Sequence, residues 1–215
     1  MAELKQPKTR RTSDFFRRIA LKGWRKSAYF TYSSRYPVLR RWLLARFSAA
    51  DKSILSIGCG SGELERDLVK TNRRVTGLDI CYEMLDSARR RGLKAVVQAD
   101  ALQLPFSPGS FDLVIFPESI GYFELHEVLP GTRQVLKPGG RVMITAYPTN
   151  FASDSIYRKW EVKTLRHELS AAGFNVLDLR LITVRQSRVT EVAAELKSEI
   201  IYILAQALDA VEPVE

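Results

Sequence analysis

The chain has 215 residues, of which 46% are hydrophobic and 27% charged, with a formal net charge of +9. This size and composition predict a globular protein with one sizeable core, and the absence of a ~20-residue apolar run or a signal peptide favours a cytoplasmic location. Two cysteines, Cys59 and Cys81, and two histidines exclude a disulfide framework and argue against a metal site.

The first segment of the chain is strongly basic. Residues 1–50 hold 13 Lys and Arg against Glu3 and Asp14, whereas the other 165 residues hold 20 basic and 22 acidic side chains. We expect residues 1–12 to be a mobile arm and a helix to begin at Ser13, a suitable N-cap, with Phe15, Phe16, Ile19 and Trp24 able to share one face. That helix either packs on the domain or touches an anionic partner, a membrane surface or RNA.

A second predicted helix, Val38 to Phe47, leads into the most informative stretch, which runs from Ser53 to Glu65. Its apolar residues predict a buried strand, Gly58, Gly60 and Gly62 follow at alternate positions, and a helix is expected from Glu63 to Lys70. Such a unit lets backbone approach a ligand closely, although a tight turn is the alternative. The spacing departs from the dinucleotide pattern G-x-G-x-x-G, and no Walker lysine follows the loop.

Strands and helices then alternate, which predicts a parallel, doubly wound sheet. Asp79 ends the second strand, 21 residues beyond Gly58, where a carboxylate can accept hydrogen bonds from ribose hydroxyls. It could instead cap the next helix. Residues 185–197 are expected to be a loop or short helix. The other expected strands are 93–99, 111–116, 141–146, 175–184 and 200–205, and the other helices are 82–91, 127–136 and 161–172.

Four marks in order resemble the class I S-adenosylmethionine-dependent methyltransferases. They are G-C-G-S-G at 58–62, Asp79, the pair Asp100-Ala101, and the turn L-K-P-G-G at 136–140 before a strand. The stretches A-D-A-L-Q-L-P-F at 99–106 and S-F-D-L-V at 110–114 are similar to small methyltransferases of ubiquinone and menaquinone biosynthesis. The resemblance covers residues 37–208 and implies a Rossmann-like α/β fold with a seven-stranded sheet in the order 3-2-1-4-5-7-6, strand seven antiparallel. It divides the chain into a basic arm and cap helix, 1–36, and a catalytic domain, 37–215.

The resemblance also implies where S-adenosylmethionine binds. The glycines would lie against the amino-acid tail and ribose, and Asp79 would hold the ribose hydroxyls. Ile80 would pack on the adenine, and Asp100 would accept a hydrogen bond from the adenine amino group. The complete set of implied cofactor-binding residues is Gly58, Cys59, Gly60, Gly62, Asp79, Ile80, Met84, Asp100, Ala101, Leu102, Pro117 and Glu118. The family often has an acid two residues before the first glycine, where this chain has Ser56, and Pro130-Gly131 is expected to interrupt the helix before the K-P-G-G turn.

Methyl transfer from a sulfonium is an in-line displacement, so the protein mainly aligns the acceptor and excludes water. A general base is needed only where the attacking atom carries a proton, and Glu118 and Tyr122 are the candidates. The first hypothesis is therefore a methyltransferase for a small or lipid-like acceptor. An RNA methyltransferase that uses the basic segment and a non-catalytic partner protein are the alternatives. The sequence F-P-E-S at 116–119, in place of N-P-P-Y, argues against methylation of DNA amino groups.

Overall fold

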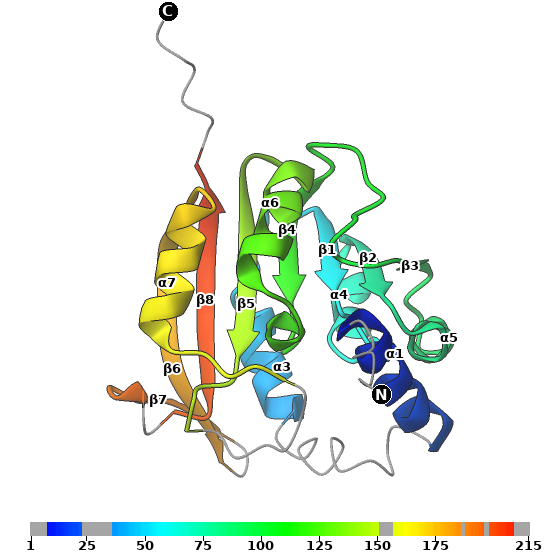
Figure 1. Cartoon of the computed structure of the whole chain (residues 1–215), viewed down its shortest axis with the longest axis horizontal. Coiled ribbons are helices and arrows are strands. Elements are labelled where there is room, and N and C mark those ends of the chain that lie inside the picture. Colours follow the sequence, from blue (N-terminus) through cyan, green and yellow to red (C-terminus); the bar gives the residue numbers. More distant parts are fainter. Residues whose placement is uncertain (1–7, 23–35, 151–156, 186–187, 196–197, 209–215) are drawn as a thin grey trace, which may run out of the picture.

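Eight strands form one sheet that crosses the molecule (Figure 1). The structure is a computed structural model, and it describes residues 8–22, 36–150, 157–185, 188–195 and 198–208. Strands β1 to β5 are parallel to one another, and β8 is antiparallel to both β5 and β6. The sheet order is β3-β2-β1-β4-β5-β8-β6-β7. The bounds are β1 Ser53–Ile57, β2 Arg74–Asp79, β3 Ala95–Gln98, β4 Phe111–Phe116, β5 Leu136–Ala146, β6 Phe174–Arg185, β7 Arg188–Glu191 and β8 Ile200–Ala207.

Helices cover both faces of this sheet. Because successive strand residues point to opposite faces, Leu55 and Ile57 of β1 join the core beneath α6 and α7, whereas Ile54 joins the core beneath α3, α4 and α5. The seven strands from β3 to β6 in the sheet order have the predicted order and directions, and β7 is an eighth strand beyond them. The α/β class is confirmed. The helices are α1 Lys8–Lys22, α3 Tyr36–Leu44, α4 Glu65–Leu68, α5 Tyr82–Arg90, α6 Leu125–Val135 and α7 Val162–Ala171, with 3-10 helices η3 Val69–Thr71 and η4 Ile120–Tyr122.

Two predictions at the ends of the chain are wrong. Residues 185–197 were expected to be a loop or short helix, but β7 lies within them and forms a hairpin with β6. β6 extends past the predicted end at Val184, and β7 supplies hydrogen-bonding partners for its end. Helix α1 begins at Lys8, so residues 8–12 are helical and Ser13 is no N-cap. Trp24 and residues 1–7 lie outside the described residues.

Two further expectations fail around α6. The helix continues through Pro130, which is exposed, as is His126, so water can replace the N–H that proline cannot offer to the His126 carbonyl. The K-P-G-G sequence, residues 137–140, lies inside β5 as a bulge and not before it. These four residues stand between the pairs Phe111–Leu136 and Leu113–Arg141, where β4 has only Asp112.

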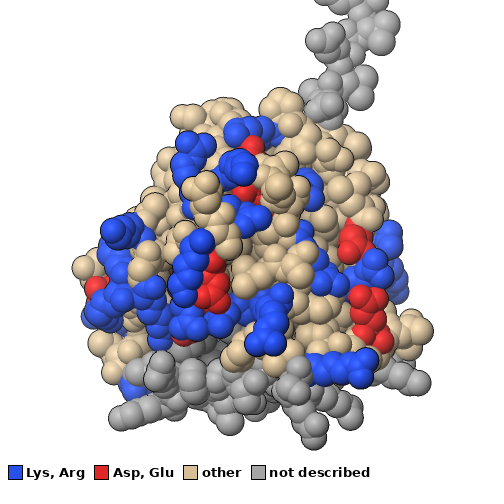
Figure 2. All heavy atoms as spheres, turned by 180° about the vertical axis from the view of Figure 1, so that it is seen from behind, with Lys and Arg blue, Asp and Glu red and all other residues tan. Residues whose placement is uncertain are grey.

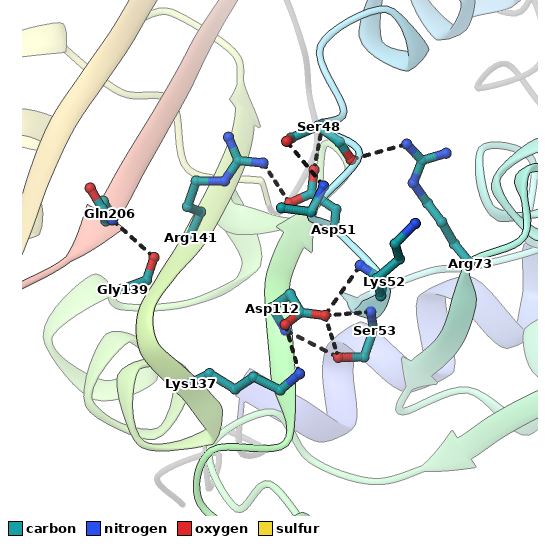
Figure 3. A network of polar contacts seen from close by, with 11 residues as sticks. Ser48, Asp51, Lys52, Ser53, Arg73, Asp112, Lys137, Gly139, Arg141 and Gln206 are labelled. Atoms are coloured by element: carbon teal, nitrogen blue, oxygen red, sulfur yellow. Dashed lines mark hydrogen bonds and ion pairs between the residues drawn. The ribbon is translucent and has the colours of Figure 1, made fainter.

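Asp112 binds three segments together at the edge of the sheet where β1 and β4 begin (Figure 3). One carboxylate oxygen accepts the Ser53 N–H at 2.7 Å and the Ser53 hydroxyl at 2.9 Å, and the other accepts Lys137 Nζ at 2.7 Å. Beside it, the Arg141 guanidinium pairs with the buried Asp51 at 2.5 Å. This edge holds strand ends in place and lies opposite the carboxyl ends of the parallel strands.

Acid is expected to destabilise the protein through Asp112. Burial acts to raise the pKa of this carboxyl, but hydrogen bonds from Lys137 and Ser53 outweigh it and lower the pKa to about 2. Because the folded pKa is below the unfolded one, this contribution is complete above about pH 4 and is lost as pH falls through about 2, a loss of about 2 kcal/mol. Urea unfolding at pH 6 and pH 2 measures it. The Asp112→Asn variant should be less stable at pH 6 and lose less on acidification; an equal loss in both proteins would contradict the assignment.

The described residues contain no helix long and apolar enough to cross a membrane. Both cysteines are free and buried. No group of three or more His, Cys, Asp or Glu side chains in the described ranges could hold a metal ion.

Candidate active site

The loop after β1 needs two glycines for packing and leaves a third facing open space. Gly58, Gly60 and Gly62 have φ angles of +70°, +52° and +73°, which side chains rarely adopt. A Cβ on Gly58 would lie 2.5 Å from the Cβ of Ser119, and one on Gly62 would lie 3.0 Å from the Cβ of Ala88. Nothing lies within 4 Å of a Cβ on Gly60. The open side of Gly60 is therefore where a ligand can lie against backbone.

Asp79 lies next to this open side. Its carboxylate accepts the Gly60 N–H at 2.8 Å and the Cys81 N–H at 2.9 Å. The N-cap of α5 is Cys81 and has no side-chain capping bond, so Asp79 does not serve as the helix cap. Burial raises the pKa of Asp79, and the N–H donors oppose that rise. A carboxylate offers about four acceptor positions, so Asp79 keeps acceptor capacity for hydroxyl donors beyond its backbone N–H groups.

The residues implied for adenine lie after β2 and β3, at the same edge of the sheet. Asp100 accepts the Leu102 N–H at 3.0 Å and so shapes the turn, in which Ala101 is buried and Leu102 exposed. Ile80 is partly buried and Met84 is buried at the start of α5. Cys59 is buried within the loop. The structure thus brings these residues to one edge, and their contact with a nucleoside stays a prediction.

Pro117 and Glu118 follow β4 at this edge. Glu118 has a φ angle of +59°, an uncommon conformation for a residue with a side chain, and its N–H donates to Thr145 Oγ1 at 2.8 Å. Its carboxylate accepts the Tyr147 hydroxyl at 2.5 Å, which joins the ends of β4 and β5. Burial raises the pKa of Glu118, and this hydrogen bond opposes the rise.

Aromatic rings from four distant segments meet beside Glu118. The Tyr157 ring packs edge-on against Tyr122 and Tyr147, each with 5.1 Å between ring centroids. Phe16 of α1 packs on Tyr122 with 5.2 Å between centroids, and Arg17 of α1 pairs with Glu83 of α5 at 2.9 Å. This aromatic cluster, Phe16, Tyr122, Tyr147 and Tyr157, suits an apolar or planar acceptor. Sequence reasoning missed Tyr157, because nothing in its local sequence marks it as a neighbour of Tyr122.

The Tyr147→Phe variant is expected to raise the pKa of Glu118 further, because it removes the hydroxyl that favours the ionised carboxylate. NMR titration of the Glu118 side-chain carboxyl carbon in labelled protein measures this. Tyr82→Phe, at an exposed tyrosine of α5, is the matched control and should leave the titration unchanged. A Glu118 midpoint that is the same in wild type and Tyr147→Phe would show that the hydroxyl does not control this carboxyl.

Lys and Arg side chains are spread over the face seen in Figure 2, with Asp and Glu between them. Several basic residues of the protein form ion pairs, such as Arg40 with Asp67 at 2.7 Å and Arg91 with Glu63 at 2.9 Å. The basic residues Arg10, Arg11 and Lys22 of α1 are exposed. Lys and Arg predominate over Asp and Glu on the face seen in Figure 2, and acidic neighbours pair with only some of the basic side chains.

The match to known proteins falls on the same elements. Residues 55–144 match the family model described as "Methyltransferase domain". The chain is 29% identical over 143 residues to a ubiquinone biosynthesis O-methyltransferase of Pseudomonas aeruginosa, an alignment that covers 63% of this chain and 62% of the relative. The chain thus spans about three fifths of the length of the curated relatives that it matches.

Solved structures share the fold at lower identity. The magnesium protoporphyrin IX methyltransferase of Synechocystis PCC 6803, solved with bound S-adenosylmethionine, superposes with a TM-score of 0.70 at 17% identity, covering 96% of this chain and 100% of that one. The [4+2]-cyclase SpnF superposes with a TM-score of 0.74 at 16% identity, covering 97% and 100%.

The strand order defines a Rossmann-like α/β fold, which is shared with a solved S-adenosylmethionine-dependent methyltransferase. Residues 55–144 of this fold match the methyltransferase domain, and the matches to O-methyltransferases and to a structure with bound S-adenosylmethionine support this molecule as the cofactor. The similarity to SpnF, a [4+2]-cyclase, shows that this fold also carries another reaction, so the fold alone does not determine the reaction.

Proposed function

We propose that the protein transfers a methyl group from S-adenosylmethionine to a small-molecule or lipid-like acceptor. The observation that carries this proposal is the open side of Gly60 beside the Asp79 carboxylate at the carboxyl edge of the sheet. The methyltransferase-domain match and the quinone-pathway relatives support the same cofactor and a small acceptor.

The residues at this edge fit the proposed cofactor. The glycine loop offers backbone, Asp79 retains acceptor capacity for the ribose hydroxyls, and the Asp100 to Leu102 turn lies where the adenine would rest. Pro117 and Glu118 lie beyond β4, toward the methionine end. When bound, the cofactor supplies a methyl group on a sulfonium, which is already activated for displacement.

On the acceptor side, the protein's own contribution is alignment and exclusion of water. The aromatic cluster provides an apolar wall that α1 covers through Phe16. Glu118 can accept a proton at its carboxylate where the attacking atom carries one, and Tyr122 lines the wall. If the acceptor atom carries no proton, positioning alone suffices.

The direct test is incubation of the purified protein with methyl-labelled S-adenosylmethionine and a metabolite and lipid extract. We expect label in an extracted small molecule or lipid, identified by mass spectrometry. Label in RNA, with binding that falls steeply between low and moderate salt, would favour the RNA alternative and the basic segment as a phosphate-binding surface. Cofactor binding without any labelled product would favour the non-catalytic alternative.

A further inference from the structure

A buried carboxyl and a buried hydroxyl meet beneath the glycine loop. Ser56, the residue before the last in β1, donates its hydroxyl to Glu65 Oε1 at 2.5 Å. Both residues are 0% exposed. Ser56 precedes the loop and Glu65 begins α4 just after it, so this hydrogen bond closes the loop from its inner side.

The second oxygen of Glu65 has no hydrogen bond of normal geometry among the described residues, although the N–H groups of Leu64 and Glu65 favour the ionised carboxylate. Glu65 Oε2 is buried without a hydrogen bond in the described part of the chain, and so is the hydroxyl of the neighbouring Ser61. An ionised carboxylate with an unpartnered buried oxygen is costly, because it has lost its water and gained little in return. A nearby positive charge from a ligand would remove much of that cost.

Within the described part of the chain, no Lys or Arg forms an ion pair with Glu65 or lowers the pKa of its carboxyl. Around it, β1 offers the Ser56 hydroxyl, the loop offers the Cys59 thiol, and β2 offers the Asp79 carboxylate, which acts with Glu65 to raise the pKa of Cys59. The nearest acid on its own segment, Glu63, is paired with Arg91 at 2.9 Å. From α3, Arg40 pairs with Asp67 at 2.7 Å. Burial is the largest cause that raises the pKa of Glu65, to about 7.

We propose that Glu65 is the negative charge beneath the glycine loop that attracts the ammonium group at the amino-acid end of the methyl donor, and that it releases a proton when the donor binds. This inference rests on the proposed function. Glu65 acts by its charge from beneath the loop, as a positioning residue without direct contact, and takes the place of an acid at position 56, where this chain has Ser56. Asp79 lies at the end of β2 and Glu65 beside β1, so the two carboxylates serve different ends of one ligand.

The test is calorimetric binding of S-adenosylhomocysteine, which carries the ammonium group, and of 5′-methylthioadenosine, which lacks the amino-acid end. With a free-state midpoint near 7, affinity for S-adenosylhomocysteine should fall about tenfold from pH 8 to pH 6, with proton release measurable in buffers of different ionisation enthalpy. Affinity for 5′-methylthioadenosine should not change. Glu65→Gln should remove the pH dependence, and Ser56→Ala should move its midpoint to higher pH.

Asp67→Asn, on the same short helix, is the matched control and should keep the wild-type pH dependence. Thermal melts of each variant establish that it is folded, and the wild-type comparison of the two nucleosides needs no variant. Equal pH dependence for both nucleosides, or none for S-adenosylhomocysteine, would overturn the role of Glu65 and leave the proposed function intact. If neither nucleoside binds at any pH, the proposed function fails as well.

Discussion

The Asp79→Ala variant is expected to bind S-adenosylhomocysteine at least about tenfold more weakly than the wild type, a loss of about 1.4 kcal/mol or more. Two effects add. The two ribose hydroxyls lose their charged acceptor, and the Gly60 N–H loses the carboxylate that holds it at 2.8 Å. Isothermal calorimetry at pH 8, where Glu65 is ionised, gives the affinity directly.

Asp112→Asn is the matched control for Asp79→Ala, because it also removes a carboxylate that accepts backbone N–H groups, but at the opposite edge of the sheet. It should lower stability and leave the affinity unchanged. If Asp79→Ala is folded, as judged by circular dichroism, and still binds with wild-type affinity, then the nucleoside does not lie at the end of β2.

The positions of most strands along the chain could be predicted from local sequence patterns, whereas their order in the sheet was implied by the resemblance to the class I methyltransferases. Compact apolar runs such as Phe111 to Phe116 and glycines such as Gly92 and Gly173 mark element ends through backbone conformation, and both glycines do have left-handed φ angles. Asp79 and Asp100 could be placed for the same reason, since Asp79 is the last residue of β2 and Asp100 stands two residues after β3. Features fixed by a residue's own neighbours in the chain are therefore readable from sequence.

The parts that sequence did not reveal depend on partners far away in the chain. β7 pairs with the end of β6, which extends past the apolar run of that strand. The sequence of β7, R-V-T-E, has no pattern that predicts a strand. Glu65 looks like an ordinary surface residue of a helix, and only the fold brings it to Ser56. The sequence shows that Ser56 stands where the family often has an acid, but it does not show that the Glu65 carboxyl lies next to Ser56.

The acceptor side illustrates the same limit. Tyr157 and Tyr122 are 35 positions apart, and their contact depends on the backbone of η4. Arg158 donates its N–H to the Gly121 carbonyl at 2.7 Å, which fixes the segment carrying Tyr157 against η4. The shape of the acceptor wall thus depends on the absence of a side chain at Gly121.

The Gly121→Ala variant is accordingly expected to lose about 3 kcal/mol of stability, with a melting temperature lower by roughly 6–12 °C. A Cβ at position 121 would lie 2.3 to 2.4 Å from three atoms of the buried Tyr157 ring, a separation that folded proteins do not show. The φ angle of Gly121 is not in the left-handed region, so the cost is steric. Thermal and urea unfolding followed by circular dichroism measure it.

Gly131→Ala is the matched control, because this glycine lies within α6 and a Cβ there would meet its nearest neighbour, Leu104, at an ordinary 3.8 Å. Replacing a helical glycine should stabilise the protein by about 0.5–1 kcal/mol. In a Tyr157→Leu background, Gly121→Ala should cost much less than in the wild type, because the two effects share one contact. An equal loss of unfolding free energy in the two backgrounds would mean that Tyr157 does not occupy the space over Gly121. Tyr157 would then not be part of the aromatic wall of the acceptor site.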